Sequence, residues 1–169
     1  GYADIFYRNT MPSGVVRQIS AIMGACAGGA VYSPAITDFI LMVEHTSYMF
    51  VTRPNVVKTV THEQVTSEEL GGASTHATKS GVTHFACQNE IVAIDHIKKL
   101  LSYMPQNCEE PAPVLPYEGG NELREKLNDI MPENSSQPYD IREIIAEVTD
   151  QDSFLVVHKD FAENIVVGF

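Results

Sequence analysis

Two adjacent glycines, Gly28 and Gly29, have the clearest capacity for chemistry in this sequence, through their backbone amides. They follow an apolar run that starts at Ile19, and a short helix is predicted from Ala30 onward. The first N–H groups of a helix lack intrahelical partners, and the helix dipole favours negative charge there. Because glycine has no Cβ, a ligand oxygen can reach these amides. The pattern therefore predicts a backbone oxyanion hole.

The same stretch allows other interpretations. A Gly-Gly pair after a strand is also common as a tight turn that only lets a helix pack closely on a sheet. A nucleotide-binding loop is excluded, because neither G-x-x-x-x-G-K-[ST] nor G-x-G-x-x-G is present. Residues 19–37 are uncharged and about long enough to span a bilayer. Their glycines, proline and hydroxyl side chains make a poor lipid-facing helix, so we expect them to be buried in protein.

Cysteine and histidine offer a competing chemistry. Cys26 lies beside the glycine pair, and a nucleophilic role would require a histidine base near it in space. The alternative interpretation is a small buried hydrophobic side chain. Cys26, Cys87 and Cys108 are widely spaced, and no Cys/His zinc spacing is present, so we expect reduced thiols and no metal site.

Composition limits the classes of protein and partner. The chain has 169 residues, enough for one domain with a core or for pieces of two. Hydrophobic residues make up 44%, which is typical of globular proteins. The net charge of −11 argues against a nucleic-acid or anionic-membrane surface. An acidic substrate would therefore have to be bound by local donors.

Strands and helices around the glycine pair follow from the apolar pattern. Residues 15–23, 39–43 and 48–51 are apolar runs of strand length, and we expect buried strands there. A helix is expected to begin at Pro54. The apolar face of the helix after the glycine pair is formed by Val31, Pro34 and Ala35.

The next segments contain two capping signals. Thr66 and Glu69 form a capping box at the start of a short helix. Residues 73–82 are small and hydroxyl-rich, which predicts a hairpin or surface loop. A helix is expected at 90–104, with Asn89 as its N-cap. Its predicted core stripe consists of Ile91, Ile94, Ile97, Leu101 and Met104.

The remaining residues suggest a linker and the start of a second unit. Residues 106–138 are rich in proline and lack sustained periodicity, apart from one helical turn expected at 123–127. A helix at 140–148 and strands at 154–157 and 165–169 would follow. The sequence lacks an initiator Met and stops within an apolar strand pattern, so we expect an excerpt from a longer polypeptide.

The segment GACAGGAVYSPAITDF, which starts at Gly24, resembles the carboxyltransferase (β) subunits of biotin-dependent acyl-CoA carboxylases. Four further stretches agree, in the family's order: GYADIF, VVKTVT, EELGGA with the following Thr75-His76, and NIVVGF. The resemblance is strongest to the β subunit of propionyl-CoA carboxylase. The α subunit of methylmalonyl-CoA decarboxylase is closely similar.

This resemblance implies an α/β, crotonase-like (ClpP/crotonase) ββα superhelix in a subunit with two such domains. Residues 1–105 would be the later part of the N-terminal domain, 106–138 the interdomain linker, and 139–169 the first elements of the C-terminal domain. The implied location is the cytoplasm of a bacterium or the mitochondrial matrix of a eukaryote.

The resemblance also implies a function for the glycine pair. Gly28 and Gly29 would be the catalytic oxyanion donors, and we predict Ala27, Ala30 and Tyr32 as substrate contacts. Biotin would enter as carboxybiotin on a partner carrier domain and not be covalently bound to this chain. The implied partners are an acyl-CoA substrate, the biotin carboxylase/biotin carrier subunit and further copies of the subunit in a hexamer. No nucleic acid, metal or membrane insertion is expected.

Two alternatives to carboxylation stay open: decarboxylation of methylmalonyl-CoA, and a non-catalytic assembly module formed by the excerpt alone. The sequence also departs from the family, which usually has proline at the positions of Arg17 and Ala25 and glycine at that of Arg53. The first two changes should relax the backbone locally, and the third puts a large side chain where glycine is usual. None changes Gly28 or Gly29.

Overall fold

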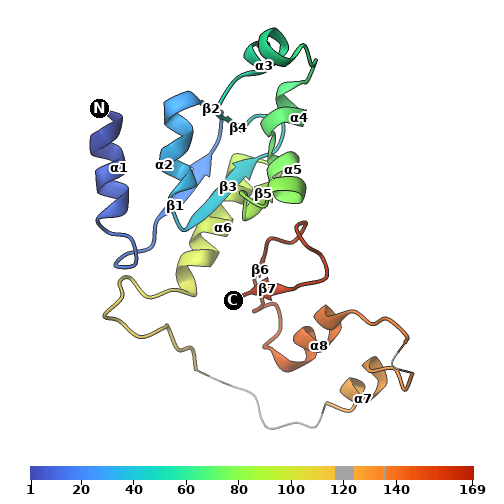
Figure 1. Ribbon diagram of the computed structural model, residues 1–169. Helices are drawn as coiled ribbons and strands as arrows, with labels where there is room; N and C mark the ends of the chain where they lie inside the picture. The colour runs from blue at the N-terminus through green and yellow to red at the C-terminus, as the bar shows by residue number, and fades with distance from the viewer. Residues whose placement is uncertain (117–123, 135) are drawn as a thin grey trace.

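The computed structural model describes residues 1–116, 124–134 and 136–169 (Figure 1). Two parallel sheets form its centre. The larger has three strands in the order β1 (Ile19–Ile22), β3 (Phe39–Val43) and β5 (Phe85–Cys87). The smaller pairs β2 (Ala25–Ala27) with β4 (Tyr48–Phe50).

Helical segments surround the two sheets. Their bounds are α1 (Tyr2–Thr10), η1 (Gly28–Val31), α2 (Tyr32–Ala35), α3 (Pro54–Thr61), α4 (Ser67–Gly71), α5 (Ala73–Thr75), η2 (His76–Ser80), α6 (Glu90–Ser102), α7 (Lys126–Ile130) and α8 (Ile141–Val148). Within the described residues, none of these helices combines the length and apolar character needed to cross a bilayer.

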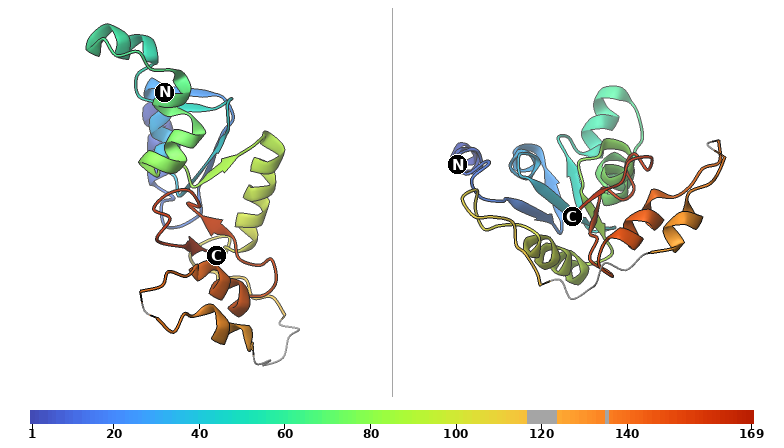
Figure 2. Two further views of the ribbon diagram at one scale, coloured as in Figure 1. Left: turned by 90° about the vertical axis from the view of Figure 1, so that its right-hand side faces the viewer. Right: turned by 90° about the horizontal axis from the view of Figure 1, so that it is seen from below.

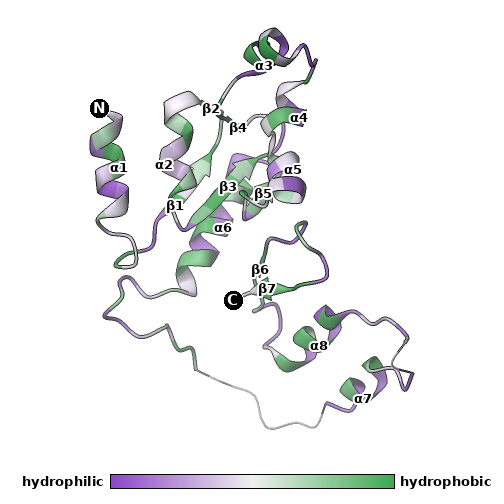
Figure 3. Ribbon diagram, viewed as in Figure 1, coloured by the Kyte–Doolittle hydropathy of each residue, from purple (hydrophilic) through white to green (hydrophobic). Residues whose placement is uncertain are grey.

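Strand β3 separates two apolar layers because its side chains alternate between the faces of the sheet. Leu41 and Val43 pack with α6 on one face. Ile40 and Met42 pack with η1, β4 and α5 on the other. Figure 2 shows α6 on the side of the sheet opposite α2 and α5, and Figure 3 shows the apolar character of the central strands. The continuous apolar run of β3 thus reflects burial on both faces.

The strand predictions are confirmed for β3 and β4, but the first strand is shorter than predicted. The amides of Val15 and Val16 donate to the Pro12 carbonyl, so these residues close a turn and the strand begins only at Ile19. The small residues after Gly24 also differ from expectation. They form strand β2 in place of a continuous turn, because they pair with β4 before the helix begins.

A hairpin or loop is predicted at residues 73–82, and this prediction is wrong for residues 73–80. They form α5 and the π-helical turn η2, in which Ala73 and Ala77 are buried. His76 stabilises this arrangement because its Nε2 lies 2.7 Å from the Met49 carbonyl and its Nδ1 lies 2.8 Å from Ser80 Oγ. A carbonyl oxygen can only accept, so Nε2 donates and Nδ1 accepts from the serine. Small and hydroxyl side chains here allow close packing on β4.

Helix α6 is present with Asn89 as N-cap, as predicted, but its core face is rotated from the predicted stripe. Ile91 is 72% exposed, and Ile94 and Leu101 are exposed as well, whereas Ala93 and Leu100 are buried. Apolar residues occur on more than one side of this helix, so periodicity alone did not select the side that meets β3. Of the predicted stripe, Met104 is buried and Ile97 packs against the core cluster.

Other predicted elements are present with changed limits or exposure. The helix at Pro54 has proline in its first turn, and the Thr66–Glu69 capping box is formed. In the helix after the glycine pair, Val31 and Pro34 are buried but Ala35 is exposed. One helical turn is predicted at 123–127. In the structure α7 begins at Lys126, and residue 123 lies outside the described residues.

The C-terminal residues pack on the α6 side of the larger sheet. Strands β6 (Val156–Val157) and β7 (Val167–Gly168) pair antiparallel. Leu155 and Val157 are buried in the same cluster as Leu41 and Leu100. Residues 154–157 and 165–169 therefore contain the predicted strands, in shorter form. The division of the chain into two domains at 106–138 stays a prediction.

His84 joins the sheet to this C-terminal segment. Its amide donates to the Ile40 carbonyl at 2.9 Å, and its ring Nδ1 accepts from the Ile40 amide at 3.1 Å. The His158 amide donates to the His84 carbonyl, and the two imidazole centroids are 4.4 Å apart. Since the backbone N–H can only donate, Nδ1 must be unprotonated in the folded state. Burial, with a contribution from His158, lowers the pKa of His84 to about 4.

This contact predicts a loss of stability in mild acid. The unfolded histidine titrates near pH 6.5, so between pH 6.5 and about 4 the unfolded chain binds a proton that folded His84 does not bind. Stability should therefore fall as the pH falls through this window. His84→Asn keeps an acceptor oxygen for the Ile40 amide and removes the titration, so urea midpoints at pH 7.5 and 5.0 should differ less in this variant. His45→Asn, which removes an exposed turn histidine outside this contact, is the matched control.

Candidate active site

The glycine pair lies where β2 ends and a helix begins. Ala27 is the last residue of β2, and its extended backbone (φ −139°, ψ 153°) makes it the N-cap of η1. Gly28 then takes φ +64°, which turns the chain into the helix. The helix thus begins at Gly28 and continues through Ala35 as η1 and α2, which confirms the predicted start within two residues of Ala30.

The amides of Gly28 and Gly29 occupy the first two positions of η1, where N–H groups have no intrahelical acceptor. The ladder between β2 and β4 ends at Ala27, opposite Phe50. The Tyr48 amide donates to the Gly24 carbonyl, and this phase of the parallel ladder aims the Gly28 amide at the Phe50 carbonyl, so the Gly29 amide, and not that of Gly28, lies beyond the ladder. Gly29 is exposed and Gly28 partly exposed, so a ligand oxygen has access to this turn.

Each glycine is required for a different reason. Gly28 has a left-handed backbone, which costs a residue with a Cβ about 1–2 kcal/mol, although no protein atom lies within 4 Å of where that Cβ would be. Gly29 has an ordinary backbone, but a Cβ there would lie 3.2 Å from Cε2 of Tyr2. One glycine therefore sets the direction of the chain, and the other allows the close approach of an aromatic ring.

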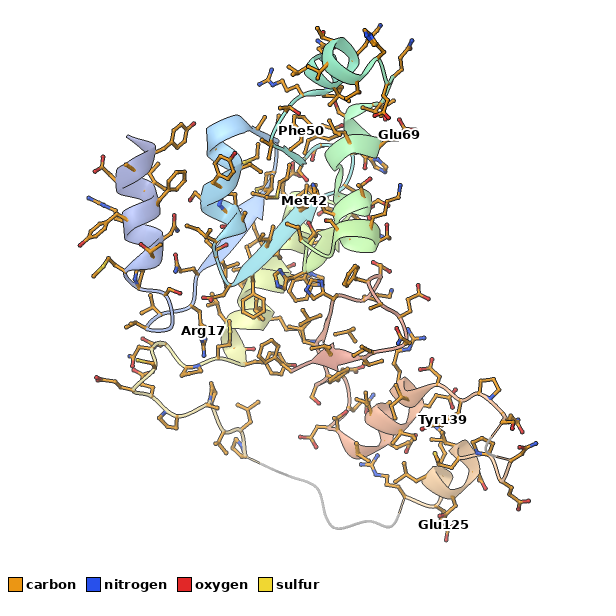
Figure 4. All side chains as sticks on the ribbon, viewed as in Figure 1. Arg17, Met42, Phe50, Glu69, Glu125 and Tyr139 are labelled. Atoms are coloured by element: carbon orange, nitrogen blue, oxygen red, sulfur yellow. The ribbon has the colours of Figure 1, made fainter. Side chains whose placement is uncertain are left out.

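An apolar groove of about 400 Å³ lies between α2, β4 and the segment from α4 to η2. Tyr32, the first residue of α2, lines it and is 48% exposed. Figure 4 shows Phe50 between α2 and α4, and this residue lines the groove as well. The other lining residues include Val31, Ala35, Met49, Leu70 and Val82. The groove offers an apolar surface whose lining begins at Val31, two residues after Gly29.

The predicted site residues are thus brought together on one continuous segment. Ala27 caps η1, Ala30 is partly buried inside it, and Tyr32 faces the groove. Sequence reasoning missed the contribution of Phe50 and His76, which reach the same groove from β4 and η2. It also missed Tyr2, whose spacing with Phe6 and Asn9 on one face of α1 was the available signal.

The nearby thiol does not have the environment of a nucleophile. Cys26 is half-buried in β2, and its Sγ lies 3.4 Å from the Ala30 carbonyl, to which a thiol can donate. Burial raises the pKa of this thiol. A protonated, hydrogen-bonded sulfur is a poor attacking group, which favours the interpretation of Cys26 as a packing residue.

Comparison with known proteins identifies the family. The family model described as "Carboxyl transferase domain" matches residues 1–169. The chain belongs to this family. It is 56% identical over its whole length to the "Propionyl-CoA carboxylase, carboxyltransferase subunit" of Haloferax mediterranei and 50% identical to the "Methylmalonyl-CoA decarboxylase subunit alpha" of Veillonella parvula.

A solved structure supports the same assignment. The chain matches the transcarboxylase 12S structure, which has methylmalonyl-coenzyme A and methylmalonic acid bound, with a TM-score of 0.95 and 43% identity over 99% of the chain. That protein is described as a hexamer and a multienzyme core. The chain spans 33% of this structure and 33% of each of the two relatives.

The backbone explanation for Gly28 can be tested by stability. Gly28→Ala should lower the free energy of unfolding by about 1–2 kcal/mol, because alanine is strained at φ +64°. Gly24→Ala is the matched control, since Gly24 has open space and no left-handed φ. It should be neutral or stabilising by up to about 1 kcal/mol. Denaturant unfolding of both variants checks this, and equal effects would contradict the backbone explanation.

Proposed function

We propose that this chain is part of a carboxyltransferase subunit that moves a carboxyl group from carboxybiotin to the α-carbon of an acyl-CoA, as in propionyl-CoA carboxylase. Family membership over residues 1–169 is the observation that carries the proposal. The position of the Gly28 and Gly29 amides at the start of a helix supports it, because transfer at the α-carbon of a thioester develops negative charge on a carbonyl oxygen.

The chemistry assigned to this segment is oxyanion stabilisation by the backbone. Carboxybiotin, held by a partner carrier domain, would supply the carboxyl group. The Gly28 and Gly29 amides would donate to the oxyanion that develops on either the thioester or the biotin carbonyl. The space beside Gly28 holds no protein atom within 4 Å of its Cβ direction, which fits the approach of such an oxygen. The apolar groove lined by Tyr32 would receive an apolar part of the acyl-CoA.

The wider organisation is proposed from the same resemblance. Residues 1–105 would complete an N-terminal crotonase-like ββα domain, 106–138 would link it to the next domain, and 139–169 would begin that C-terminal domain. A hexamer and a biotin carboxylase/carrier subunit would complete the enzyme. The hexamer assembly described for transcarboxylase 12S supports this proposal. We propose the cytoplasm of a bacterium, or the mitochondrial matrix of a eukaryote, as its location.

A decarboxylase is the second candidate function, supported by the 50% identity to the methylmalonyl-CoA decarboxylase subunit of Veillonella parvula. The oxyanion donors would serve this reaction equally, because removal of the carboxyl group leaves the same thioester enolate. Co-purification of the full-length protein with a biotin carboxylase subunit, or with membrane subunits, would distinguish the two.

The amide of Gly29 can be tested in the full-length subunit with two substitutions that share a Cβ. Gly29→Pro removes the N–H, and Gly29→Ala keeps it. Losing one oxyanion donor typically costs about 10²–10³ in turnover, so the proline variant should be slower than the alanine variant by about this factor. Carboxyl transfer from carboxybiotin to acyl-CoA is the measurement, after sizing has shown that both variants assemble.

Cys26→Ser tests the competing thiol mechanism in the same assay. It keeps the size of the side chain and a donor for the Ala30 carbonyl, so turnover should stay within about tenfold of the wild type, as expected for a buried hydroxyl. If Cys26→Ser abolishes turnover while Gly29→Pro retains it, the oxyanion proposal is wrong.

The 169-residue chain by itself should show no carboxyl transfer, because the proposed active site also requires the C-terminal domain. Incubation with carboxybiotin and propionyl-CoA checks this, with the full-length subunit as the positive control. Transfer by the chain alone would mean that the active site is misplaced.

A further inference from the structure

Helix α1 lies alongside the η1–α2 segment (Figures 1 and 2). Tyr2, Phe6 and Asn9 occupy one face of α1, at spacings of four and three residues. Each of them contacts the η1–α2 segment directly or through its aromatic neighbour. The helix is thus placed to support the whole segment that begins with the glycine pair.

The N-terminal part of this face meets the turn itself. The three protein atoms nearest to the Cβ direction of Gly29 are Cε2, Cδ2 and Cζ of Tyr2, at 3.2, 3.4 and 3.7 Å. The Tyr2 ring stacks on Phe6, with centroids 6.0 Å apart. Phe6 in turn meets the edge of Tyr32, with centroids 6.3 Å apart. A row of three aromatic rings therefore runs from Gly29 to the start of α2.

The other part of the face is held by polar contacts. Asn9 Oδ1 accepts from Ser33 Oγ at 2.8 Å, and its Nδ2 donates to Gln18 Oε1 at 2.9 Å. The Gln18 side chain donates back to the Asn9 carbonyl at 2.7 Å. These bonds hold the C-terminal end of α1 against α2 and against Gln18, the residue before β1. Because the aromatic contacts of Tyr2 and Phe6 hold its N-terminal end, α1 is fixed beside the η1–α2 segment at both ends.

We infer that Tyr2 is a positioning residue for the oxyanion donors, because its ring lies against Gly29, 3.2 Å from where a Cβ would be, and limits rotation of the Gly28–Gly29 peptide. This inference rests on the proposed function of that turn. No protein atom lies within 4 Å of where a Gly28 Cβ would be. Side-chain packing therefore does little to hold the turn at Gly28 itself. The Tyr2 ring supplies support from one side and leaves the ligand side open.

The test uses kinetics of the full-length subunit with carboxybiotin and propionyl-CoA. Tyr2→Ala should lower kcat by about 10- to 100-fold, with KM within about twofold, because a small displacement of a catalytic group costs rate. Tyr2→Phe keeps the ring and should retain at least half of wild-type kcat. Tyr7→Ala, which removes a 63% exposed tyrosine from the same helix, is the matched control and should leave kcat unchanged.

A double-mutant cycle, in which Gly29 gains a methyl group and Tyr2 loses its ring, tests the contact directly. Gly29→Ala should lower kcat in the wild-type background, since its Cβ meets the Tyr2 ring. In the Tyr2→Ala background the same Cβ occupies space that the ring has left. The relative kcat of the double variant should therefore be higher than the product of the relative kcat values of the two single variants. Effects that simply multiply would overturn the inference, as would full activity of Tyr2→Ala or a loss in Tyr2→Phe equal to that in Tyr2→Ala.

The outcomes separate this inference from the function on which it rests. If Gly29→Pro is as active as Gly29→Ala, the oxyanion function itself fails. If Gly29→Pro is inactive but Tyr2→Ala is normal, only the role of Tyr2 fails. Should Tyr2→Ala not assemble, Tyr2→Leu keeps apolar volume without the flat ring, and it should lower kcat while the hexamer survives. Wild-type kcat in Tyr2→Leu would then overturn the inference.

Discussion

Burial of strand β3 on both faces is the constraint on which the rest of this structure depends. Its backbone pairs with β1 on one side and β5 on the other, so its hydrogen-bonding groups are satisfied within the sheet. Its side chains then divide the apolar interior into two layers, with Leu41 facing α6 and Met42 facing the helices on the opposite side. Of the elements near the candidate site, β2, η1 and β4 pack on the layer that contains Met42.

The glycine turn derives its position from this arrangement. Strand β1 is held by β3, and β2 is held by β4, so the chain that emerges after Ala27 has both its origin and its direction fixed. Val31 anchors η1 in the same layer as Met42. The amides at Gly28 and Gly29 are thus held by a rigid frame, which is what preorganised electrostatic stabilisation requires.

The site and the fold respond differently to pH. Backbone amides do not titrate, so the donors of the proposed oxyanion hole keep their hydrogen-bonding capacity across the physiological range. His84 is a buried acid-sensitive group, whose neutral ring links β3 to the C-terminal segment through Ile40 and His158. Acid should therefore act on this protein through its packing and not through the protonation of the donors.

The sequence by itself determined the local features: the glycine turn before a helix, the β3 run, the caps at Thr66 and Asn89, and the family. The turn, the apolar run and the caps depend on neighbouring residues, whose backbone preferences and hydrogen bonds are local. Only the tertiary structure decided which side of α6 is buried, that residues 73–80 are helical, and that Tyr2 lies against Gly29. In each case the local sequence allows more than one structure, and contacts with residues distant in the sequence select one of them.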